Sequence, residues 1–221
     1  MIRLTFINPN ATQAMTDNIG AAARAALPEA RVTAIPNTKG PLSIQGPEDG
    51  DAAVPGMLGL IPPAIEAGAQ AIVISCFDDT GLKQAQAISA VPVLGIGQAS
   101  YLMAAALGRR FSVVTSLPVS TPVIEGNIRE QGFSWNCASI RPCGIPVLEI
   151  DEGSEATRAR LADEIALARD EDGAQAVVLG CAGMAVLEPD LAARTGMVLI
   201  DGVAAAAHLA RAALGFSGQL R

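Results

Sequence analysis

Two segments of the chain are nearly identical, and each ends in a cysteine: residues 68–76 read GAQAIVISC and residues 173–181 read GAQAVVLGC. A thiolate accepts a proton and a thiol donates one, so two opposed cysteines could take a proton from one face of a carbon acid and return one to the other face. Approach to about 3–3.5 Å on each side would place the sulfurs roughly 6–7 Å apart, far beyond the ~2.05 Å of a disulfide. Cys76 and Cys181 therefore predict a two-base site that inverts a carbon centre.

The similarity between the two halves extends beyond the cysteines. Cys76 and Cys181 lie 105 residues apart (181 − 76), and VPVLGIGQA pairs with GMVLIDGVA at the same offset. RLTFINP resembles RRFSVVTS at an offset of 107 (111 − 4). Three matched strands in one order indicate a duplicated α/β unit. Two alternatives stay open. The similarity could reflect only the shared composition of buried parallel strands, and either cysteine could be a small core residue without a catalytic role.

Short β-branched runs alternate with alanine-rich stretches along the chain, which is typical of parallel sheets with helical crossovers. Strands are predicted at residues 2–8, 31–36, 91–96, 109–118 and 197–201, besides the strand that precedes each cysteine. Helices are predicted at residues 11–27, 57–67, 81–89, 98–107, 122–131, 154–172, 187–194 and 202–214. Residues 37–55 and the region around Trp135, Cys137 and Cys143 are expected to be irregular.

These elements predict an α/β fold of two pseudo-symmetric Rossmann-like lobes, each with a mainly parallel sheet flanked by helices, and an active-site cleft between them. Lobe 1 would comprise residues 1–98 and 204–221 and carry Cys76, and lobe 2 would comprise residues 99–203 and carry Cys181. Ligands of open parallel sheets bind beyond the carboxyl ends of the strands, where both cysteines are expected.

The residues that follow each cysteine suggest how the thiols are tuned. A helix N-terminus after either cysteine would lower the pKa of its thiol. The small residues Ala182 and Gly183 would let backbone N–H groups approach a developing oxyanion. A carboxylate beside Cys76 would raise the pKa of the thiol, so at least one of Asp78 and Asp79 is expected to cap the following helix or to bind substrate N–H groups.

Composition excludes several classes of function. The 22 acidic and 15 basic residues give a net charge of −7, with no basic cluster for a nucleic acid. The first residues do not read as a signal peptide, no stretch reads as a membrane span, and four cysteines without an export signal suggest free thiols. A cytoplasmic protein without nucleic-acid or membrane partners is expected.

No cofactor or metal is expected either. His208 is the single histidine and no cysteines are closely paired, so a zinc site is not predicted. Residues 95–100, GIGQAS, imitate a dinucleotide fingerprint but lack the acidic residue about 20 positions on. Cys137 and Cys143 are interpreted as structural or incidental.

Four motifs together resemble the aspartate/glutamate racemase superfamily, and most closely its hydantoin/allantoin racemase branch: INPN, CFDDTGL, RFSVVTSL and VLGCAGM. The resemblance covers essentially the whole chain. It implies cofactor-independent racemisation, an isomerase activity, by Cys76 and Cys181 as catalytic cysteines. One departure is that many hydantoin racemase-like sequences have Gly-Asp-Pro where this chain has Asp78, Asp79 and Thr80.

The resemblance also suggests substrate-binding positions. Asn8 or Asn10 would bind a polar edge of the substrate, with Ser43 as a further candidate. Thr115 and Ser116 would hydrogen-bond to substrate oxygens. Three residues could supply an apolar subsite: Phe77, Met184 or Tyr101.

The most specific hypothesis is a racemase of 5-substituted hydantoins with a small-molecule substrate and a homo-oligomeric state. Other superfamily activities remain alternatives: an allantoin or amino-acid (Asp/Glu) racemase, a maleate-type cis-trans isomerase, or a decarboxylase, which would need only one thiol. A non-catalytic two-lobed binding protein is the alternative from another class, although such receptors are usually exported.

Overall fold

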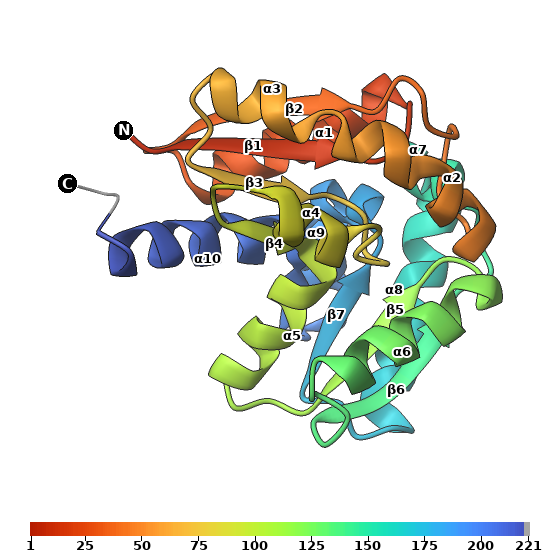
Figure 1. Cartoon of the computed structure of the whole chain (residues 1–221). Helices are drawn as coiled ribbons and strands as arrows, with labels where there is room; N and C mark the ends of the chain where they lie inside the picture. Colours follow the sequence, from red (N-terminus) through yellow and green to blue (C-terminus); the bar gives the residue numbers. More distant parts are fainter. Residues whose placement is uncertain (219–221) are drawn as a thin grey trace.

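Two four-stranded parallel sheets form the framework of the protein, whose computed structural model describes residues 1–218 (Figure 1). The first sheet has the order β2-β1-β3-β4, with β1 Arg3–Asn8, β2 Arg31–Pro36, β3 Ala71–Ile74 and β4 Val93–Gly95. The second has the order β6-β5-β7-β8, with β5 Phe111–Thr115, β6 Cys137–Pro142, β7 Ala176–Gly180 and β8 Leu199–Asp201. All strand pairs are parallel. The same strand order in both sheets confirms the predicted α/β fold of two similar units.

Helices flank both sheets (Figure 1). In the first half these are α1 Gln13–Ala26, α2 Pro47–Leu58, α3 Ile61–Glu66, α4 Leu82–Ile88 and α5 Ile96–Ala106. In the second half they are α6 Thr121–Glu130, α7 Val147–Glu152, α8 Glu155–Asp170, α9 Glu188–Thr195 and α10 Gly202–Phe216, with short 3₁₀ helices η1 Pro118–Ser120 and η2 Ala182–Leu187. Within residues 1–218, none of the helices is both long and apolar enough to cross a membrane.

Two predicted irregular regions contain regular elements. Residues 37–55 include the start of α2, where Pro47 pre-sets the helical backbone and Glu48 and Asp49 place negative charge in the first turn. Cys137 and Cys143 lie in and directly after β6, an edge strand whose residues are all partly exposed. Because neither of its faces is fully buried, β6 lacks the apolar pattern that marks the central strands.

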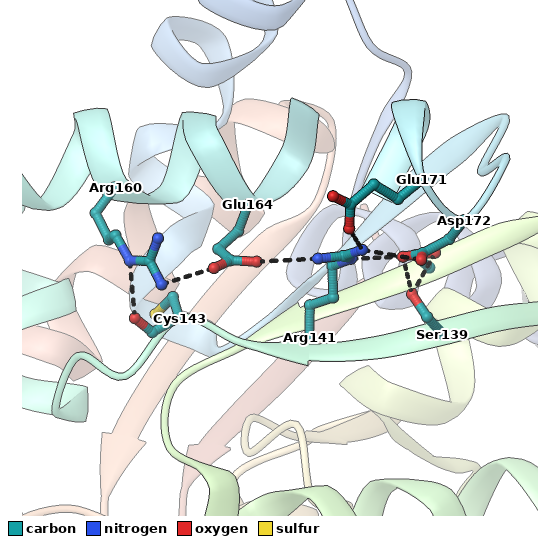
Figure 2. Close-up of polar contacts among 8 residues, drawn as sticks. Ser139, Arg141, Cys143, Arg160, Glu164, Glu171 and Asp172 are labelled. Carbon is teal, nitrogen blue, oxygen red and sulfur yellow. Dashed lines mark hydrogen bonds and ion pairs between the residues drawn. The ribbon is translucent and has the colours of Figure 1, made fainter. Parts of the chain in front are cut away.

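Charged side chains hold the edge strand β6 against α8 (Figure 2). The guanidinium of Arg141 pairs with Asp172, with Glu171 and, at 3.6 Å, with the buried carboxylate of Glu164. Arg160 pairs with the same Glu164 and donates from Nε to the carbonyl oxygen of Cys143. This network satisfies a carboxylate that would otherwise be buried without a partner, and it fixes the segment that leads from β6 towards α7.

Helices α5 and α10 cross between the two units. Helix α5 follows β4 of the first sheet and contacts β7 and β8 of the second, whereas α10 follows β8 and contacts β3 and β4 of the first. Figure 1 shows α10 running beside the first sheet. The division of the chain into lobes at residues 98 and 203 remains a prediction, and residues 219–221, which it assigns to lobe 1, lie outside the described residues.

Candidate active site

One pocket is lined by residues from both units, most of them at or just after the carboxyl ends of equivalent strands. The first unit contributes Asn10, Met15, Ile44, Ser75, Cys76, Phe77 and Asp78. The second contributes Thr115, Ser116, Ser120, Val147, Gly180, Cys181 and Ala182. The free space is about 30 Å³, room for about two water molecules.

Both predicted catalytic cysteines lie in this pocket. Cys76 follows β3 and Cys181 directly follows β7, so each occupies the carboxyl end of a central strand. The Thr80 hydroxyl donates to Cys76 Sγ at 3.3 Å. Both thiols are free. They therefore reach one ligand space from opposite units, as a two-base reaction requires.

Burial dominates the electrostatics of both thiols. It raises the pKa of Cys181 to about 12, while the Gly183 backbone N–H acts in the opposite direction. It raises the pKa of Cys76 further, and the nearby Asp78 carboxylate adds to the increase. The predicted lowering by a helix N-terminus is therefore wrong for this structure. Only a 3₁₀ helix follows Cys181, and α4 begins six residues after Cys76, at Leu82.

The turn after Cys76 is held by helix α6 of the second unit. The Asn127 side chain donates to the Asp78 carbonyl oxygen at 2.8 Å. Gln131, which follows α6, donates to the Asp79 carboxylate at 3.1 Å. In the equivalent arrangement, α1 packs against η2, which follows Cys181. The first helix of each unit thus supports the cysteine segment of the other.

Comparison with known proteins agrees with this architecture. The sequence model of the family described as Asp/Glu/Hydantoin racemase matches residues 4–210. The chain belongs to this family. It is 41% identical to a hydantoin racemase of Rhizobium meliloti, covering 97% of this chain and 89% of that protein. It is 37% identical to a hydantoin racemase of a Pseudomonas species, covering 95% and 84%. The solved structure of an allantoin racemase from Klebsiella pneumoniae superposes with a TM-score of 0.93 at 36% identity, covering 98% and 89%.

Within this racemase fold, six of the eleven predicted substrate-binding residues line the pocket. They are Asn10, Phe77, Asp78, Thr115, Ser116 and Ala182. Asn10 accepts hydrogen bonds from the Asn8 side chain at 2.8 Å and from the Thr12 backbone at 3.0 Å. Its orientation is therefore set by the loop that ends β1.

The other five predicted binding residues lie outside the pocket lining: Asn8, Ser43, Asp79, Gly183 and Met184. Asn8 is buried behind Asn10 and donates to it and to Thr16. The segment of Ser43 contributes the neighbouring Ile44 instead. Gly183 packs against the Asp151 backbone, where an added Cβ would lie 3.2 Å from its Cα atom. Met184 is fully buried in the core, as is Tyr101, a candidate for the apolar subsite, and neither lines the pocket.

Asp79 has a structural role that its position in the sequence does not reveal. Its carboxylate accepts from the backbone N–H groups of Gly97 at 3.0 Å and Gln98 at 2.8 Å. It therefore caps α5 rather than the following helix α4, and it does not line the pocket. Burial raises the pKa of Asp79 to about 7 even with these donors present.

Six pocket residues were not predicted: Met15, Ile44, Ser75, Ser120, Val147 and Gly180. The repeat carried a signal for two of them, because Ser75 and Gly180 precede the two cysteines at the same offset. Ile44 and Val147 come from the connections after β2 and β6, which are equivalent strands of the two sheets. These connections differ in length and sequence, so their correspondence becomes visible only in the fold.

Proposed function

We propose that this member of the family racemises 5-substituted hydantoins by proton transfer at C5 between Cys76 and Cys181. The observation that carries the proposal is the placement of both thiols in one pocket, at equivalent strand ends of two similar units. The hydantoin racemases that share 37–41% of their residues with the chain support the same substrate class.

The proposed reaction needs one thiolate and one thiol. The thiolate takes the C5 proton, and the electrons of the broken C–H bond delocalise into the adjacent ring carbonyl. The opposite thiol then gives its proton to the other face of C5, so the two sulfurs exchange protonation states. In this proposal the Ser116 hydroxyl, which lines the pocket, donates to a ring oxygen. The Thr115 hydroxyl already donates to the Gly180 carbonyl oxygen at 2.9 Å, and the Gly183 N–H acts on the Cys181 sulfur.

The charge of the pocket favours a neutral ring over an acidic substrate. Asp78 is the ionisable carboxylate among the lining residues, and above its pKa of about 7 its negative charge opposes the entry of a carboxylate. Aspartate, glutamate and maleate all carry carboxylates, so these alternatives are less compatible with the site. Allantoin is the second candidate, because it is itself a hydantoin with a ureido group at C5 and the chain superposes on an allantoin racemase.

Deuterium incorporation tests the proposed reaction directly. One enantiomer of 5-benzylhydantoin, incubated with the enzyme in D₂O, should lose optical activity and gain deuterium at C5 at matching initial rates. Polarimetry and proton NMR follow the two changes, with an enzyme-free sample to subtract spontaneous racemisation. The proposal would be contradicted if 5-benzylhydantoin kept both its optical activity and its C5 proton and allantoin also did not react.

The raised thiol pKa values predict how the rate depends on pH. At a fixed pH below the pKa, each unit of increase in pKa reduces the thiolate fraction about tenfold. Because burial raises the pKa of Cys181 to about 12 and that of Cys76 further, the reactive thiolate becomes more abundant as pH rises. We expect kcat/KM for 5-benzylhydantoin to increase with pH from 6 to 8, by less than tenfold per unit, because Asp78 ionises over the same range and its charge raises the pKa of Cys76. A flat profile over this range, after subtraction of the uncatalysed rate, would show that the free enzyme already holds a thiolate.

The expected cytoplasmic location and homo-oligomeric state remain proposals. All four cysteines are free in the structure, which is consistent with a reducing compartment. The two-base reaction itself requires both thiols to stay reduced. Size-exclusion chromatography with light scattering would determine the number of subunits.

A further inference from the structure

The pocket contains a carboxylate that the proposed proton transfer does not use. Asp78 is two residues from Cys76 and lines the same space. Within residues 1–218 its carboxylate forms neither a hydrogen bond nor an ion pair, although its main-chain carbonyl is held by Asn127. Burial of this half-buried side chain raises the pKa of Asp78 to about 7. The main chain at Asp78 is therefore held by the second unit, whereas its carboxylate lines the pocket without a partner.

The lack of a hydrogen-bond partner is specific to Asp78 and is not shared by the carboxylate of Asp79. Asp79 is fully engaged by donors from Gly97, Gln98 and Gln131. Of these two consecutive aspartates, Asp79 caps α5 and Asp78 lines the pocket. A second polar group on the same wall is also unsatisfied: the buried Ser75 hydroxyl lines the pocket without a hydrogen-bond partner.

An unpartnered carboxylate in the pocket destabilises the anion formed during the reaction, and a suitable substrate can offset this electrostatic effect. Proton abstraction makes the hydantoin ring negative, and an adjacent carboxylate opposes that charge. The cost is offset if the substrate itself brings a positive charge or N–H donors to the carboxylate. A substrate with an alkyl or aryl group in that position displaces water and leaves the carboxylate unpaired, which is unfavourable.

We propose that Asp78 is a specificity-determining residue that selects hydantoins whose C5 substituent carries a cationic or N–H-donating group. The Ser75 hydroxyl supplies a second polar contact to the same substituent. This inference rests on the proposed hydantoin racemisation and names the class of substituent that the site prefers. Aminoalkyl, guanidinoalkyl and ureido substituents belong to this class.

A matched pair of substrates isolates the effect. 5-(4-Aminobutyl)hydantoin and 5-pentylhydantoin have the same number of heavy atoms and differ by an ammonium group in place of a methyl group. The wild-type enzyme should favour the aminobutyl compound at least tenfold in kcat/KM at pH 8, where Asp78 is ionised. In Asp78→Asn this ratio should fall at least tenfold, with a higher kcat/KM for the pentyl compound, because the carboxylate that opposes the ring anion is gone.

The control variant is Asp51→Asn, which removes an exposed carboxylate from α2 of the same unit and should preserve the wild-type ratio. Racemisation of both substrates and of 5-benzylhydantoin at similar rates by the wild-type enzyme would overturn this inference alone. Absence of racemisation with all three and with allantoin would overturn the proposed function and the inference with it. An equal loss on both substrates in Asp78→Asn would assign Asp78 a structural role. The wild-type ratio is informative even if that variant does not fold.

Discussion

Removal of either pocket thiol is expected to abolish racemisation. Cys76→Ala and Cys181→Ala should each lower the rate for 5-benzylhydantoin at least about 10³-fold, because general acid–base groups contribute about 10²–10⁴-fold and one face of C5 would lose its group. Each variant keeps one thiol, which can still remove and return a proton on its own face. In D₂O we therefore expect slow deuterium exchange without inversion, confined to one enantiomer in Cys76→Ala and to the other in Cys181→Ala.

This opposite selectivity distinguishes two bases from one. Chiral chromatography with mass spectrometry measures exchange and inversion in the same sample. Cys137→Ala is the matched control, since Cys137 lies in β6 and does not line the pocket, and it should retain racemisation. If both single-thiol variants exchanged the same enantiomer, or if either racemised within tenfold of the wild type, the reaction would not use one sulfur on each face.

Much of this site was predictable because the sequence repeats itself. Each of the repeated nine-residue segments contains a buried strand, β3 or β7, and a parallel sheet places the ends of such strands on one edge. A repeat at a near-constant offset then brings two equivalent cysteines to equivalent places. The two similar units follow from this repeat, whereas the strand order within each sheet is seen only in the structure.

The electrostatics could not be predicted from the same patterns. Whether a helix N-terminus lowers a thiol pKa depends on where the helix starts, and the segments after Cys76 and Cys181 begin with a turn and a 3₁₀ helix. Desolvation then outweighs the local N–H groups. The burial of each thiol depends on side chains from both units, so it could not be predicted from the sequence around either cysteine.

The apparent dinucleotide motif is explained by the same kind of distant contact. The GIGQAS segment ends β4 and begins α5, and its glycines leave room for the turn after Cys76. A Cβ atom on Gly97 would lie 2.4 Å from the Phe77 carbonyl oxygen, and one on Gly95 would lie 2.0 Å from Asp79 Oδ1. The start of α5, which in dinucleotide-binding proteins would hold a phosphate, is therefore occupied by the protein's own carboxylate.

Loss of that carboxylate should disturb both stability and catalysis. Asp79→Ala leaves the buried N–H group of Gly97 and two further donors without an acceptor, each a penalty of about 1–3 kcal/mol when water cannot reach it. Asp79 also has a left-handed backbone with φ of 50°, which aspartate tolerates better than alanine. We expect the free energy of unfolding to fall by about 3 kcal/mol in urea titrations.

The catalytic consequence follows because Asp79 and Cys76 share one turn. A displacement of about 1 Å at a reacting group can cost about 10²-fold in rate, so kcat for 5-benzylhydantoin should fall by this order in Asp79→Ala, with a smaller change in KM. Asp79→Asn keeps one side-chain oxygen as an acceptor and should retain an intermediate stability and rate. Asp51→Ala, an exposed change in the same unit, should alter neither quantity. Wild-type stability with a lowered KM in Asp79→Ala would instead place this carboxylate in contact with substrate, against the cap that the structure describes.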